Sequence, residues 1–131
     1  MRRPTVACVI LAVVMGSSPA LSQGQFPYER DLVLEARAMR GSKRLPVLTI
    51  EANGRAQIDL WCKRGRGTAA IDGGAITITV GDMKDEPCTP ERAQADDEMI
   101  EALGSMTGWS LRGDTVTLTG AKQLRFRAAT N

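Results

Sequence analysis

The sequence predicts a mainly β fold: an antiparallel meander that closes into a small barrel-like sheet, with one α-helix. Two observations predict it. Short segments in which apolar and polar residues alternate recur along the chain, and Gly-containing turns join them, which is typical of consecutive antiparallel strands. One later segment has helical spacing instead. The pattern contains about seven or eight short strands. We expect a sheet of that size to close, or nearly close, into a barrel, because closure removes its exposed edges.

Each strand is expected where β-favouring residues alternate with polar ones. Residues 47–50 are β-favouring, and Asn53-Gly54 after them is a strong hairpin signal because both residues tolerate a positive φ. Asp72-Gly73-Gly74 is a second tight turn. Residues 63–67 are expected to form a basic loop, and residues 81–87 an irregular one. The expected strands cover residues 32–38, 47–50, 55–60, 69–71, 75–80, 109–111, 115–119 and 124–127.

The helix is predicted over residues 90–103. Thr89 can cap its first turn, Pro90 suits the first helical position, and Glu91 is favourable near the positive end of the helix dipole. The apolar residues on one side of this segment recur at helical spacing: Met99, Ile100, Leu103 and Met106. The acidic residues do not converge on a cation and are expected on a solvated face: Asp96, Asp97, Glu98 and Glu101.

Residues 1–22 have the pattern of a secretory signal peptide. Arg2 and Arg3 supply the positive start, an apolar run follows, and Ala20-Leu21-Ser22 places small residues at a cleavage site, with cleavage after Ala20 as the alternative. The apolar run is about ten residues long, too short to cross a bilayer core of roughly 30 Å as a helix. Cys8 lies at the start of this run rather than after it, so no lipoprotein anchor is expected.

Export would leave one domain at residues 32–131 behind a flexible leader at residues 23–31. The protein is expected in the periplasm or outside the cell, as a monomer and with no transmembrane segment after signal cleavage. The whole chain carries 17 basic and 15 acidic residues. Without Arg2 and Arg3 the charges balance at 15 each, so nucleic acid is not an expected partner.

The chain contains no His. This excludes His general bases, Ser-His-Asp and Cys-His catalytic arrangements, and His-ligated zinc or haem. The serines lie in no GxSxG setting, and Asp82, Asp85 and Glu86 match no calcium-loop spacing. We therefore expect no enzymatic activity, no catalytic residue, no bound metal and no cofactor.

Cys62 and Cys88 are the two cysteines left after export, and they are expected to form a disulfide. Closing the loop between them would stabilise the fold by roughly 3–4 kcal/mol. Two alternatives stay open. One is a pair of buried free thiols, and the other is a redox-active pair whose thiol is activated by the neighbouring Lys63 and Arg64. The spacing of the two cysteines excludes a CxxC site.

Lys63, Arg64 and Arg66 are the densest group of positive charges in the expected domain. With Gly65 and Gly67 between them, their donors could hold an anionic group. A lipopolysaccharide phosphate and a peptidoglycan carboxylate are the natural candidates in a cell envelope. The alternative is a solvated loop whose charge keeps the protein soluble.

The order of these signals resembles the META domain family, also called the heat-shock-protein HslJ-like family, over roughly residues 46–128. The resemblance implies a small exported bacterial protein with a β-rich fold and one helix, linked to stress tolerance and without a defined activity. Gly67 matches a family glycine, whereas Trp61 and Lys63 stand where the family has Gly and Asn beside the cysteine. The matching elements are the Asn53-Gly54 hairpin, the strand ending in Cys62, the Asp72-Gly73 hairpin, the loop ending in Cys88, the acidic helix with Glu98 and Leu103, and the closing strands around Leu118 and Leu124-Arg125-Phe126.

Together these observations predict a non-enzymatic exported envelope protein that acts by binding, in envelope maintenance or stress tolerance. Its partner is expected to be an envelope protein, a glycan or a lipid, contacted through residues 63–67. The alternative is a periplasmic inhibitor of a lysozyme-like enzyme, which would insert this loop into the cleft of the enzyme.

Overall fold

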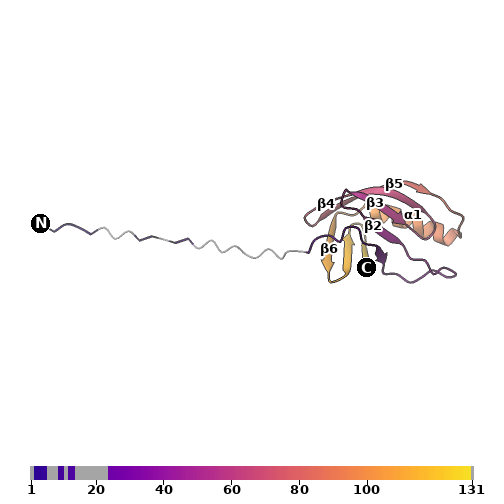
Figure 1. Cartoon of the computed structure of the whole chain (residues 1–131), viewed down its shortest axis with the longest axis horizontal. Helices are drawn as coiled ribbons and strands as arrows, with labels where there is room; N and C mark the ends of the chain where they lie inside the picture. The colour runs from indigo at the N-terminus through magenta and orange to yellow at the C-terminus, as the bar shows by residue number, and fades with distance from the viewer. Residues whose placement is uncertain (1, 6–8, 11, 14–23, 131) are drawn as a thin grey trace.

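The computed structural model describes residues 2–5, 9–10, 12–13 and 24–130. The described residues form eight antiparallel strands and one helix. Each strand pairs with its neighbour in sequence, and the last pairs with the first, so the sheet is a closed barrel (Figure 1). The predicted fold class is confirmed. The elements are β1 (Leu32–Leu34), β2 (Val47–Ile50), β3 (Arg55–Asp59), β4 (Arg64–Asp72), β5 (Ala75–Lys84), α1 (Pro90–Gly104), β6 (Gly108–Arg112), β7 (Thr115–Thr119) and β8 (Gln123–Ala128).

Most of the predicted signal peptide, 14 of its 22 residues, lies outside the described residues. Cys8 and both predicted cleavage sites, after Ala20 and after Ser22, are outside the described residues. In the described part of the chain, no helix combines the length and the hydropathy needed to cross a membrane.

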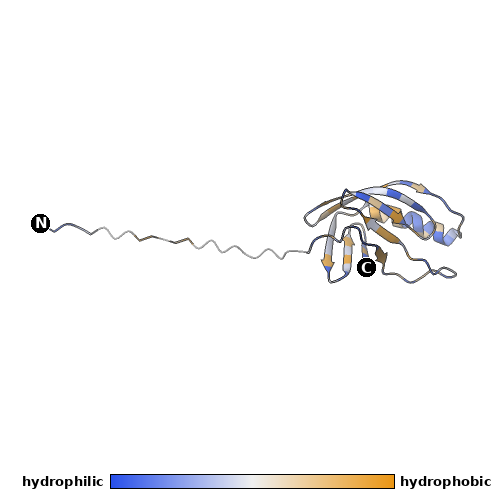
Figure 2. Ribbon diagram, viewed as in Figure 1, coloured by the Kyte–Doolittle hydropathy of each residue, from blue (hydrophilic) through white to orange (hydrophobic). Residues whose placement is uncertain are grey.

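Alternation along the strands builds the core. In β8, Leu124, Phe126 and Ala128 are buried while the residues between them are exposed, because successive side chains of a strand point to opposite faces. Figure 2 shows the same alternation of apolar and polar residues along the visible strands. The outward Arg125 and Arg127 both pair with Glu35. The core is therefore the barrel interior, as the period of the sequence predicts.

The helix packs where the barrel is least paired. β5 and β6 share one residue pair, Ala75 with Gly108, and α1 connects these two strands and packs against β5 (Figure 1). Met99 and Leu103 on its inner side are 5% and 1% exposed. Helix packing beside a weakly paired strand protects backbone groups that would otherwise be open to another chain.

Thr89 caps the helix as predicted. Its hydroxyl oxygen accepts a hydrogen bond from the backbone N–H of Arg92 at 3.4 Å, and Pro90 opens the first turn. The helix ends at Gly104, one residue beyond the predicted end, within the usual uncertainty of a helix terminus.

The predicted hairpin at Asn53-Gly54 is present and joins β2 to β3. Of the two residues only Gly54 has a positive φ, 89°, and the Asn53 side chain accepts a hydrogen bond from the Arg55 N–H at 3.0 Å. The predicted extent of the first strand is wrong. The first strand ends at Leu34 rather than at residue 38. Ala36 and Ala38 are exposed, and small side chains outside the core add little to strand stability.

The predicted loops at residues 63–67 and 81–87 are also wrong over most of their length. β4 already begins at Arg64, and β5 continues to Lys84. A register shift between Gly65 and Gly67 lets the strands pass each other closely. A Cβ on Gly67 would overlap the Thr79 carbonyl oxygen, and one on Gly81 would lie 2.6 Å from the Arg66 carbonyl oxygen. These glycines therefore permit a bulged ladder rather than a loop.

A matched pair of Gly substitutions tests this interpretation. Gly67→Ala is expected to lower the free energy of unfolding by about 1–3 kcal/mol, because the new methyl group forces the two strands apart. Gly104→Ala is expected to raise it by up to about 1 kcal/mol, because beyond its chain neighbours and its own helix backbone no described atom lies within 4 Å of the new Cβ, and Ala favours the helix. Urea unfolding monitored by circular dichroism measures both. Equal effects of the two changes would contradict the close approach at Gly67.

The predicted leader makes contacts with the barrel in its described part. Phe26 is 5% exposed, and the centroid of its ring lies 5.2 Å from that of Trp109. The Arg30 guanidinium donates to the Ala129 carbonyl oxygen at 2.8 Å. Burial of an aromatic ring stabilises a small core substantially. The folded unit therefore includes residues before the predicted start at residue 32.

Candidate functional site

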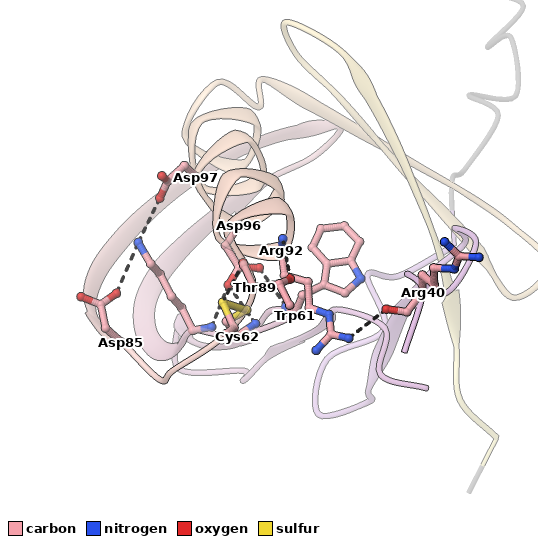
Figure 3. Close-up of a disulfide and its surroundings, with 10 residues drawn as sticks. Arg40, Trp61, Cys62, Asp85, Thr89, Arg92, Asp96 and Asp97 are labelled. Carbon is pink, nitrogen blue, oxygen red and sulfur yellow. Dashed lines mark hydrogen bonds and ion pairs between the residues drawn. A yellow bond between two sulfur atoms is a disulfide. The ribbon is translucent and has the colours of Figure 1, made fainter. Parts of the chain in front are cut away.

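A disulfide joins Cys62 to Cys88, with 6.0 Å between the two Cα atoms (Figure 3). Cys62 lies in the turn between β3 and β4 and is buried, whereas Cys88 is exposed and stands just before the helix cap Thr89. The predicted pairing is therefore present. It ties the turn at residues 60–63 to the start of α1.

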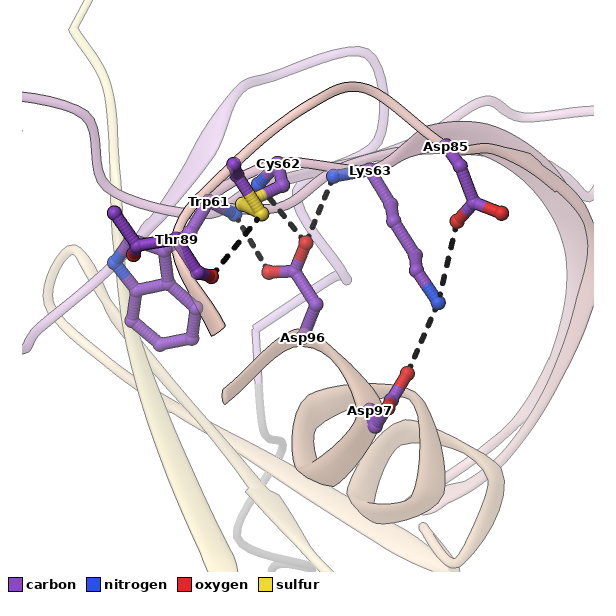
Figure 4. A network of polar contacts seen from close by, with 8 residues as sticks. Trp61, Cys62, Lys63, Asp85, Thr89, Asp96 and Asp97 are labelled. Carbon is purple, nitrogen blue, oxygen red and sulfur yellow. Dashed lines mark hydrogen bonds and ion pairs between the residues drawn. A yellow bond between two sulfur atoms is a disulfide. The ribbon is translucent and has the colours of Figure 1, made fainter. Parts of the chain in front are cut away.

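Asp96 of α1 holds the same turn from inside. Its Oδ1 accepts the N–H of Trp61 at 2.9 Å, and its Oδ2 accepts the N–H groups of Cys62 and Lys63 at 2.9 and 2.8 Å (Figure 4). The residue is 0% exposed, so the expectation of a solvated position is wrong. Three backbone donors replace the water that a buried carboxylate loses.

The position of Asp96 in the sequence is a signal that its side chain is buried. Asp96 precedes Met99 by three positions and Leu103 by seven, so it lies on the same side of the helix as the apolar residues. A carboxylate at such a position needs donors from another segment. The sequence does not identify that segment, because the three N–H groups belong to a turn more than 30 positions earlier in the chain.

Lys63 bridges two acidic side chains. Its Nζ lies 2.9 Å from Asp97 Oδ1 and 3.4 Å from Asp85 Oδ1 (Figure 4). The hydrogen bond to Asp97 is the main cause that raises the pKa of Lys63 above its ordinary value, and Asp85 adds to the effect. The bridge therefore acts below the ordinary pKa of lysine and is lost as the pH rises through the raised value. Asp85 and Asp97 are thus both paired with a cation of the protein itself.

Arg64 and Arg66 project from the exposed face of β4. Arg64 lies 3.8 Å from Asp59 across the strand pair, whereas Arg66 has no ion pair with any described residue. The register sets Arg66 opposite Gln57 and Thr68 opposite Arg55. The structure thus separates Lys63 from the predicted group of three.

Arg55, rather than Lys63, lies beside Arg66. The two arginines occupy diagonal positions on neighbouring strands and line one hollow of about 350 Å³. Neither has an ion-pair partner among residues 24–130. Glu51, Gln57 and Thr68 line the same hollow. Sequence reasoning missed Arg55 because only the β3–β4 register brings it next to Arg66.

The acidic side chains do not form a cation site in the described part of the chain. No group of three or more Cys, Asp or Glu residues there is arranged to hold a metal ion. Asp96 points into the core and Asp97 points to Lys63, so consecutive acidic residues of α1 face different partners (Figure 4).

Comparisons with known proteins agree with this architecture. The profile of the family described as META domain matches residues 27–131. Two solved structures are similar in fold. The NMR structure of a protein from Burkholderia xenovorans is 20% identical, with a TM-score of 0.63, over 79% of this chain and 84% of that chain. A second NMR structure is 19% identical, with a TM-score of 0.57, over 75% of this chain and 87% of that chain. No curated protein matches the chain.

Proposed function

Because the chain belongs to the META domain family, whose β-rich fold it shares, we propose that it is a non-enzymatic binding module of the cell envelope that recognises an anionic group. The observation that carries this proposal is the pair Arg55 and Arg66. Both side chains are exposed on the outer face of the barrel and form no ion pair with a described residue, although Glu51 lines the same hollow. We name this surface, with Gln57 and Thr68, the arginine face.

The arrangement of the arginine face favours an anionic ligand. The two guanidinium groups stand at diagonal positions and carry the same charge, so they repel each other. A carboxylate or phosphate between Arg55 and Arg66 would remove that repulsion and accept several N–H donors in a fixed geometry. The Gln57 amide and the Thr68 hydroxyl stand beside the two cations and can donate to further oxygens.

The location and the absence of catalysis are parts of the same proposal. The predicted signal peptide and the disulfide support an oxidising, extracytoplasmic compartment. The lack of His supports a binding role, since the commonest general base is missing. In a cell envelope, the phosphates of lipopolysaccharide and the carboxylates of peptidoglycan are the anionic groups that such a site could bind. Binding them would serve envelope maintenance under stress.

The alternative function, inhibition of a lysozyme-like enzyme, depends on a protruding loop that the described structure does not contain at residues 64–67. That function needs residues 63–67 to protrude as a loop, but Arg64 to Gly67 are all paired with β3, and all except Arg66 are also paired with β5. No observation in the described structure favours it over the arginine face.

The test is co-sedimentation with purified peptidoglycan sacculi and, separately, with lipopolysaccharide aggregates. Arg55→Ser combined with Arg66→Ser is expected to weaken binding to one of these by roughly tenfold or more, because two charge-assisted contacts are lost. Binding by the unaltered protein is expected to fall with added salt.

A control with the same change of charge is Arg112→Ser combined with Lys122→Ser. Both residues are exposed and lie outside the arginine face, so binding should stay close to that of the unaltered protein. An equal loss in both double variants would show a general charge effect. That result, or no binding to either material, would contradict the proposed site.

A further inference from the structure

A second hollow, of about 720 Å³, lies at the other end of β4 from Arg64 and Arg66. It is bordered by the Gly73-Gly74 turn and by the segment that precedes β1. No residue of its lining is charged, and three of the five aromatic residues of the chain contribute to it. The side chains that line it are Gln25, Phe26, Tyr28, Ile71 and Trp109.

The aromatic side chains form one continuous group at this hollow. The centroid of the Phe26 ring lies 5.2 Å from that of Tyr28 and 5.2 Å from that of Trp109. The Phe26 and Trp109 rings meet edge to face, with an interplanar angle of 83°. Phe26 and Trp109 are buried, whereas Tyr28 is 37% exposed. Within residues 24–130, Tyr28 is the one large hydrophobic residue classed as exposed. Its hydroxyl makes no hydrogen bond with the described residues.

The backbone holds Tyr28 at the surface. The Tyr28 N–H donates to the Phe26 carbonyl oxygen at 2.9 Å, and Glu29 follows with a φ of 63°. Glu29 is the one described residue other than Gly with a positive φ, a conformation that costs energy for such a side chain. Two hydrogen bonds to the β2 end keep it there, from the Glu29 N–H to Ile50 and from the Ala52 N–H to the Glu29 carboxylate, both 2.9 Å.

We propose that this hollow, the tyrosine hollow, binds a neutral carbohydrate. An exposed aromatic ring offers an apolar face to the C–H groups of a sugar, while the Tyr28 hydroxyl and the Gln25 amide can exchange hydrogen bonds with its hydroxyl groups. The uncharged lining gives an ionic ligand no counterion. The volume suits a short oligosaccharide, since ligand sites usually measure about 300–1,000 Å³.

A peptide that added a strand would find few partners here. The Gly73 carbonyl oxygen already accepts the Trp109 Nε1–H at 2.7 Å, and the Gly74 carbonyl oxygen accepts the Trp109 N–H at 3.0 Å. Strand addition depends on free backbone groups along an edge, and these two are occupied. A saccharide depends on side chains instead, and the exposed Gln25 amide and Tyr28 hydroxyl make no hydrogen bond with the described residues.

The experiment is a titration of the full chain with maltotetraose, cellotetraose and chitotetraose, followed by NMR of the two indole N–H groups. Trp61→Phe leaves one indole signal and so assigns Trp109. At least one saccharide is expected to shift the Trp109 signal at millimolar concentration and to leave that of Trp61 in place. Tyr28→Ala should raise the dissociation constant by roughly tenfold, and Tyr28→Phe should cause a smaller loss because it keeps the ring.

The double variant Arg55→Ser with Arg66→Ser should bind the saccharide unchanged, which separates this site from the arginine face. Three results would overturn the proposal: no shift with any of the three saccharides, equal binding by Tyr28→Ala and the unaltered protein, or a Trp109 shift caused by an oligoproline peptide alone. The last result would identify the hollow as a site for proline-rich segments.

Discussion

Asp96→Asn is expected to lower the free energy of unfolding by about 2–4 kcal/mol, a large effect for a change of one atom. The carboxylate accepts three backbone N–H groups inside the protein. The amide offers one acceptor oxygen and turns an NH₂ group towards donors, so at least one buried N–H loses its partner. Hydrogen bonds to a charged acceptor are also stronger than those to a neutral one.

Urea unfolding with the disulfide intact measures this effect. Glu101→Gln is the matched control, because Glu101 is an exposed carboxylate of the same helix. It should change stability by less than about 0.5 kcal/mol. If Asp96→Asn were as mild as Glu101→Gln, the three hydrogen bonds would not hold the turn at residues 60–63 in solution.

Replacement of Cys62 and Cys88 by Ser is expected to lower the free energy of unfolding by roughly 3–4 kcal/mol, since the unfolded chain regains the freedom of the loop between them. The disulfide spans a sequence separation of 26. The unaltered protein unfolded in the presence of a reductant should lose a similar amount. A double variant as stable as the oxidised protein would contradict a stabilising role of the disulfide.

The disulfide and Asp96 hold one turn, so their contributions should not add. A double-mutant cycle that combines Asp96→Asn with the two Cys→Ser changes is expected to show coupling of about 0.5–3 kcal/mol. The turn leads directly into β4, which carries Arg66 of the arginine face. Loss of both restraints is therefore expected to weaken anion binding as well as the fold.

Local sequence patterns were sufficient for most elements of the fold. Period-two alternation located the strands, and the Thr89-Pro90 cap with the apolar spacing of Met99 and Leu103 located the helix. They failed at Gly65, Gly67 and Gly81. Glycine in a basic, polar segment has the local properties of a loop, and its use as space between two strands depends on a partner that is distant in sequence.

The sequence by itself determined the number and order of the elements, the barrel class and the pairing of Cys62 with Cys88, because these depend on periodicity, turn residues and composition. Only the tertiary structure decided which side chains meet. It placed Asp96 against the turn at residues 60–63 and paired Lys63 with two carboxylates, Asp85 and Asp97. It also set Arg55 beside Arg66. The physical reason is that strand register and helix packing bring together groups many residues apart, whereas the local pattern of each segment records only which face is apolar.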